Sequence, residues 1–121
     1  MRAVAAGLAV VALLAACGGG GGGSAQPSGS TAVTMTEFKF DPSSISVPHG
    51  GATFWLVNSG TSSHDMAVRD SSGKTIATSE LVSAGDSKAF TVNIPAAGSY
   101  TFYCTQPGHE ASGMKGTLTV T

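Results

Sequence analysis

Residues 100–120 read YTFYCTQPGHEASGMKGTLTV, and this stretch decides both the fold class and the chemistry of the chain. It opens with an alternating segment that places Phe102 and Cys104 on one face of a strand. It closes with a second alternating segment, in which Leu118 and Val120 share a face. Between them a histidine and then a methionine follow the cysteine, with four residues separating each from the next. The stretch predicts two β-strands joined by a loop that carries ligand-type side chains.

The rest of the chain also reads as strands. AFTVNI places Phe90, Val92 and Ile94 on one face, and the continuously apolar ATFWLVN fits a central strand, whichever of its two aromatic residues faces inward. The stretch 75–83 fits either a strand or a helical turn. Turn residues recur between these segments at the spacing of a β-sandwich. We therefore expect an all-β, antiparallel sandwich.

A second histidine heads another apolar strand. In HDMAV, alternation groups His64 with Met66 and Val68, and turns Asp65 away. His64 and Cys104 thus each end an apolar face, so we expect them to meet at one edge of the core.

Four side chains then form one ligand set. A thiolate, two imidazoles and a thioether are soft or borderline donors, which together suit copper in both oxidation states. Two histidines and a cysteine in a trigonal array, with a weak axial methionine, describe an electron-transfer copper centre. The sequence predicts one copper ion, Cu(I) or Cu(II), held by His64, Cys104, His109 and Met114.

Each of these residues alone also has a structural interpretation. A histidine at the start of an apolar strand is often a hydrogen-bonded structural residue, and a lone buried cysteine is usually a small hydrophobe. Their order and shared faces favour the metal site. By contrast, we interpret His49 as a solvated loop residue and Met66 as packing, and Met35 gives no signal.

The N-terminus predicts export. Residues 1–16 have a short basic start and an apolar run too short to span a bilayer, which needs about 20 apolar residues, so they read as a signal peptide. The ending LAAC resembles the lipobox of bacterial lipoproteins, which would place a lipid on Cys17. Residues 17–30 form a Gly/Ser-rich linker, and 31–121 form the domain. We expect an extracytoplasmic protein, held to a bacterial membrane by the lipid alone; a plain secreted protein is the alternative.

Cysteine usage and charge restrict the function classes further. Cys17 and Cys104 are the only cysteines, so lipidation of Cys17 leaves a lone thiol outside the cytoplasm, and metal ligation explains it. Beyond the signal peptide the chain has five basic and seven acidic side chains, without a basic cluster that would suggest nucleic acid. We expect a monomer.

The domain resembles the small type 1 blue copper proteins, the cupredoxins of the plastocyanin, azurin and auracyanin group. The residues that carry the resemblance are VNSGTSSHDMAV and the tail from Tyr100 to Val120. It implies a Greek-key sandwich with copper at one end, equatorial histidine and cysteine ligands, and an axial Met114. The four residues between the cysteine and the histidine resemble azurin and auracyanin more than plastocyanin. Many cupredoxins have asparagine where this chain has Asp65; we expect this acid to accept bonds from Thr105 and, when ionised, to favour Cu(II).

These features predict an electron carrier and no enzyme, since four protein ligands leave no open position for substrate. Small, uncharged neighbours would let His109 reach the surface, where redox proteins would dock transiently through a small interface. Three alternatives are a copper carrier or scavenger with the same ligands, a hydrolase with Cys104 as nucleophile, and an adhesive sandwich.

Overall fold

The computed structural model describes residues 25–121, which contain strands, turns and loops but no helix. Within this part of the chain, therefore, no helix is long and apolar enough to cross a membrane. The signal peptide, Cys17 and most of the linker lie outside the described residues, and the division at residues 16 and 30 stays a prediction. The strands are β1 (Thr31–Thr36), β2 (Lys39–Asp41), β3 (Ser44–Val47), β4 (Gly50–Asn58), β5 (Ala67–Arg69), β6 (Thr75–Thr78), β7 (Ser87–Ile94), β8 (Gly98–Tyr103) and β9 (Lys115–Val120).

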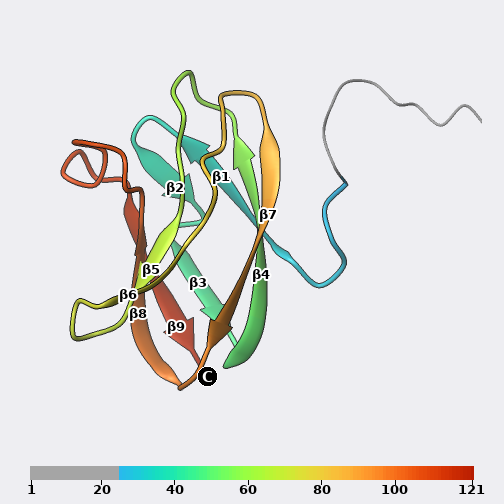
Figure 1. The fold of residues 1–121 in the computed structure, drawn as a ribbon, viewed down its shortest axis with the longest axis vertical. Coiled ribbons are helices and arrows are strands. Elements are labelled where there is room, and N and C mark those ends of the chain that lie inside the picture. Colours follow the sequence, from blue (N-terminus) through green and yellow to red (C-terminus); the bar gives the residue numbers. More distant parts are fainter. Residues whose placement is uncertain (1–24) are drawn as a thin grey trace, which may run out of the picture.

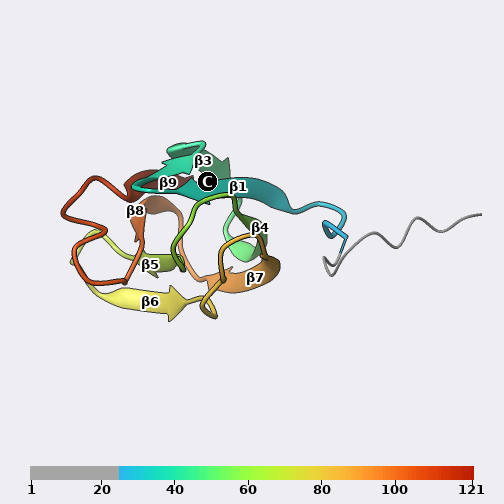
Figure 2. The same cartoon turned by 90° about the horizontal axis from the view of Figure 1, so that it is seen from above.

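The strands form two packed sheets, which confirms the predicted sandwich. One has the order β2-β1-β4-β7 and the other β3-β9-β8-β5-β6. The view from above separates them, with β1, β4 and β7 on one side and β8, β5 and β6 on the other (Figure 2). Each sheet is mixed, because β1 pairs with β4 and β3 with β9 in parallel. A parallel pair needs a crossover connection, and between β1 and β4 the chain supplies it by passing through the other sheet as β3.

The core lies between the sheets, where the predicted alternation is confirmed. Phe90, Val92 and Ile94 of β7 are buried while their neighbours are exposed, as expected for strands with one face in the core. In the central strand β4, Phe54 is the aromatic residue that enters the core cluster. The stretch left open at 75–83 forms strand β6 and then a bridge at Val82.

Four connections gather at one end of the sandwich. They are the β1–β2 turn, the β4–β5 and β6–β7 connections and the β8–β9 loop, all at the upper end in Figure 1, opposite the C-terminus. Backbone hydrogen bonds join the first three: Ser59 donates to Met35, and Asn58 donates to Asp86. Segments far apart in sequence therefore meet at this end.

Candidate metal centre

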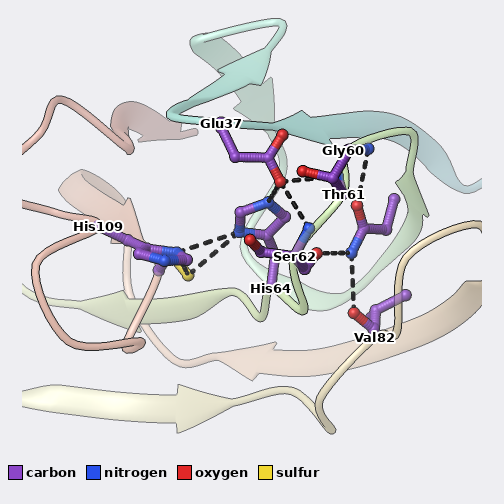
Figure 3. A network of polar contacts seen from close by, with 9 residues as sticks. Glu37, Gly60, Thr61, Ser62, His64, Val82 and His109 are labelled. Carbon is purple, nitrogen blue, oxygen red and sulfur yellow. Dashed lines mark hydrogen bonds and ion pairs between the residues drawn. The ribbon is translucent and has the colours of Figure 1, made fainter.

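His64 enters the site on a segment that is fixed on both sides. Its backbone forms a bridge with Val82, with N–H to O distances of 3.0 and 2.8 Å, and its side chain is fully buried. The buried Asn58 stabilises residues 59–63, the loop that leads to His64. Its side-chain amide donates to the carbonyls of Ser62 and Val82, and its side-chain oxygen accepts from the N–H of Gly60 (Figure 3). Because buried polar groups are costly to leave unpaired, this satisfied network specifies one path for the loop.

Cys104, His109 and Met114 come from the loop between β8 and β9. Cys104 follows the last residue of β8, buried on the same face as Phe102. Backbone bonds tie the three together, because the N–H of Cys104 donates to the carbonyl of Met114, and that of Met114 to the carbonyl of His109, both at 3.1 Å. Gly108 has a φ of 79°, which suits glycine, at the turn before His109. The loop thus returns on itself within eleven residues and keeps its ligand-type residues at one place.

Three of the predicted ligands bring their donor atoms to one point. The two Nδ1 atoms of His64 and His109 lie 3.2 Å apart, and Sγ of Cys104 lies 3.9 and 3.5 Å from them respectively. Donors bound at about 2.0–2.3 Å to one ion in a trigonal plane would stand about 3.5–3.8 Å apart. The observed separations of 3.2–3.9 Å lie around this range, so the three side chains are grouped closely enough to hold one metal ion with two imidazoles and one thiolate. Met114 is fully buried in the core cluster at the end of the same loop.

Asp65 joins the two sides of the site. Its carboxylate accepts from the backbone N–H of Thr105 at 2.7 Å and from the hydroxyl of the same residue. The partner expected from the sequence is therefore confirmed. Since Asp65 adjoins His64 and Thr105 adjoins Cys104, these bonds hold two ligand-bearing segments in register.

Glu37 also contacts the site, and no pattern in the sequence predicted that it would. Its Oε1 lies 3.2 Å from Nε2 of His64, and because a carboxylate only accepts, the ring nitrogen is the donor. Hydrogen bonds to Oε1 from the backbone N–H of Ser62 and Thr61 lower the pKa of Glu37 to about 2. Glu37 is therefore ionised at neutral pH, directly behind a ligand (Figure 3). The contact depends on the pairing register of β1 with β4, and no local sequence pattern indicates that register.

The environment of Cys104 argues against a role of its thiol as a catalytic nucleophile. The side chain is 1% exposed, and burial raises the pKa of its thiol. A reactive cysteine needs a thiolate in an accessible, electropositive place. The remaining histidine and methionine assignments agree with the structure: His49 lies outside the site with Nδ1 2.8 Å from the carbonyl of Thr121, and Met66 packs in the core.

Comparisons with known proteins point to the same chemistry. The family described as "Copper binding proteins, plastocyanin/azurin family" matches residues 27–121. Plastocyanin from Dryopteris crassirhizoma is 40% identical over 95 residues, which cover 69% of this chain and 88% of that protein. Auracyanin-B from Chloroflexus aurantiacus is 50% identical over 46 residues, covering 38% of this chain. That match spans only 20% of the length of the auracyanin.

The fold is shared with solved structures. Auracyanin from Roseiflexus castenholzii, crystallised in the dithionite-reduced state, superposes with a TM-score of 0.68 at 25% identity, over 83% of this chain and 99% of that one. An auracyanin B structure has a TM-score of 0.70 at 25% identity, over 81% of this chain and 92% of that one. The family match covers both the loop of Cys104 and the segment of His64, where the donor atoms converge. The chain therefore belongs to the plastocyanin/azurin family of copper-binding proteins, the type 1 blue copper cupredoxins, whose cofactor is one copper ion.

Proposed function

We propose that this protein is a membrane-tethered, extracytoplasmic blue copper protein that carries single electrons between redox partners. The observation that supports this most is the convergence of the donor atoms of His64, Cys104 and His109. These three would be the equatorial ligands, and Met114 the axial one. Bound copper would supply a one-electron couple between Cu(I) and Cu(II).

The surroundings of the ligands suit electron transfer rather than catalysis. His64 and Cys104 stand at or near strand ends, and hydrogen bonds through Asn58 and Asp65 hold their segments together. A scaffold that keeps the same donor atoms in place in both oxidation states lowers the reorganisation energy of electron transfer. Four protein ligands also leave no open position for a substrate, unlike a catalytic metal site. We therefore propose that the protein is not an enzyme.

His109 would be the place where partners approach. Its ring is half-buried, and Phe38, 42% exposed, lies against it with 5.0 Å between ring centroids. Pro107 and Ala111 beside it are small and exposed. We propose that redox proteins dock on this port surface, defined as His109, Phe38, Pro107 and Ala111.

The port surface carries little net charge. Glu110 is the one acidic residue between the loop ligands, and its carboxylate lies 2.5 Å from the guanidinium of Arg69. This pair offsets the charge of Glu110 where a partner would approach. Docking would therefore depend mainly on apolar contact, in a small and transient interface.

The membrane anchor rests on the sequence of the N-terminus. We propose that Cys17 carries the lipid and that the glycine-rich linker separates anchor and copper site mechanically. Replacing Cys17 with serine should release the protein from membranes and leave the copper spectrum unchanged. Membrane retention of Cys17→Ser would contradict a lipid anchor at this residue.

The absorption spectrum of the purified Cu(II) protein tests the copper function. We expect an intense blue band from thiolate-to-copper charge transfer, because Cys104 is the one anionic sulfur ligand available. Cys104→Ser should abolish the band, and Met114→Leu should keep it and raise the reduction potential. A colourless Cu(II) adduct of the wild type would refute the type 1 site.

Copper exchange separates the electron carrier from a copper carrier or scavenger. A thiol that is 1% exposed at the end of a core strand favours a slowly exchanging ion. We expect transfer of copper to an added chelator to be slow compared with electron exchange. Fast transfer would favour the copper carrier.

A further inference from the structure

Glu37, in the turn between β1 and β2, concentrates its hydrogen bonds on one oxygen atom. Oε1 accepts from the N–H groups of Thr61 at 2.8 Å and Ser62 at 2.7 Å, and from Nε2 of His64 at 3.2 Å. Figure 3 shows the carboxylate between the loop and the imidazole ring. The turn therefore contacts His64 on the side of the ring opposite its metal-facing nitrogen.

Gly60 leaves the space that this carboxylate occupies. A Cβ atom at Gly60 would lie 2.6 Å from Oε1 and 2.7 Å from Oε2 of Glu37, closer than real Cβ contacts. The colliding atoms are the end of a flexible side chain, so the carboxylate would move before the backbone did. The absence of a side chain at residue 60 thus allows Glu37 to reach His64.

We propose that Glu37 is a positioning residue that fixes the metal-facing nitrogen of His64 and lowers the reduction potential of the copper site. The proposal rests on the blue copper function proposed above. A carboxylate that accepts from the outer N–H of a metal-binding histidine fixes the tautomer and orientation of the ring. Here the bond from Nε2 leaves Nδ1 free to bind the metal.

The charge of Glu37 adds an electrostatic effect. A negative charge behind an imidazole ligand stabilises Cu(II) more than Cu(I), because Coulomb attraction grows with the charge of the ion. The side chain of Glu37 is 25% exposed, so water screens it only in part.

Glu37→Gln isolates the charge. All three bonds go to one oxygen, so the amide oxygen of glutamine can accept the same three N–H groups. We expect this variant to keep the blue band. The ratio of its Cu(II) affinity to its Cu(I) affinity should fall about tenfold, which raises the reduction potential by about 59 mV for one electron. Glu80→Gln is the matched control, because the side chain of Glu80 is 82% exposed and pairs with Lys88 at 3.7 Å. A potential for Glu37→Gln equal to that of Glu80→Gln would overturn the proposal.

Gly60→Ala tests the same contact without changing Glu37. The added methyl group should displace the carboxylate from His64, so the potential should rise in the direction seen for Glu37→Gln. The blue band should persist, because none of the four ligands is altered. A Gly60→Ala protein with the wild-type potential would overturn the proposed dependence on this contact.

The metal-free protein separates this proposal from the copper function. Nitrogen chemical shifts of the His64 ring should show the proton on Nε2 in the wild type, and a loss of this preference in Glu37→Ala. A proton on Nδ1 in the wild type would overturn the positioning role whether or not the copper protein is blue. A colourless wild-type copper adduct with the proton on Nε2 would refute the copper function and support the positioning of His64.

Discussion

The two histidines of the site present the same atom to the same point but are held in opposite ways. His64 is fully buried, its backbone bridges to Val82, and Glu37 accepts from its outer nitrogen. His109 is half-buried on a loop, and within residues 25–121 its ring forms polar contacts through Nδ1 alone. Its ring lies against that of the exposed Phe38 in a T-shaped arrangement, with an interplanar angle of 66°.

This difference gives the two histidines different roles in the site. The anchored histidine is fixed by groups that determine its tautomer, its orientation and the charge behind it. The other histidine is held by a backbone turn, and its ring is only half-buried. A site built in this way can be rigid around the metal and still accessible to a partner at one place.

Removing each ring should give the largest contrast. We expect both His64→Gly and His109→Gly to lose the blue band. Added imidazole should restore the band in His109→Gly, because the vacated space adjoins the surface, whereas the fully buried space left in His64→Gly is closed to it. Absorbance titrations with imidazole measure both. Equal recovery in the two variants would contradict the division into an anchored and an open histidine.

Loss of the Asn58 side chain should destabilise the segment that carries His64. The side chain of Asn58 forms three hydrogen bonds of 2.8–2.9 Å in a buried place. At about 1 kcal/mol for each bond, Asn58→Ala should reduce the free energy of unfolding by about 2–3 kcal/mol. Ser112→Ala, on the exposed His109 loop, is the control and should stay within about 0.5 kcal/mol of the wild type. Urea unfolding of the metal-free proteins measures both, and equal losses would refute the contrast between the two sides.

The pH dependence of stability should report the anchor specifically. The folded pKa of Glu37 is about 2, below its ordinary value of 4.5, so its contribution is complete above about pH 4.5 and is lost as the pH falls toward 2. The stability difference between the metal-free wild type and Glu37→Gln should therefore shrink from pH 5 to pH 2. Unfolding curves at several pH values test this. A difference that stays constant over this range would show that the ionised carboxylate does not stabilise the fold.

The loop of residues 104–114 was predictable because its information is local. Alternation places Cys104 on the core face of β8, and the short loop returns the chain to β9 with the histidine and methionine between. His64 was predictable for a related reason, since it heads a segment whose apolar face continues through Met66. The bond from Thr105 to Asp65 was expected from the resemblance to the cupredoxins, many of which have an asparagine at this position that bonds across to the cysteine loop.

Glu37 was not predictable because its role depends on strand pairing. It lies 27 residues before His64, and the contact exists because Met35 of β1 pairs with Asn58 of β4. Alternation tells which face a side chain occupies, but it does not tell which strand lies beside it or in which direction. For the same reason, the prediction of purely antiparallel sheets did not include the two parallel pairings, β1 with β4 and β3 with β9.

The open side should show its role in the rate of electron exchange, where we expect the smallest effect. Ala111→Glu adds a bulky charge to the port surface beside His109, without touching any ligand, so the blue band and the potential should stay nearly unchanged. Exchange with small redox proteins should slow several-fold and become clearly dependent on ionic strength, whereas the wild type should respond weakly, because Arg69 offsets Glu110. Thr119→Glu adds the same charge on the exposed face of β9, toward the opposite end of the sandwich, and should exchange like the wild type. If Ala111→Glu matched Thr119→Glu at every salt concentration, the open edge of His109 would not be the port, and electrons would have to leave by another route.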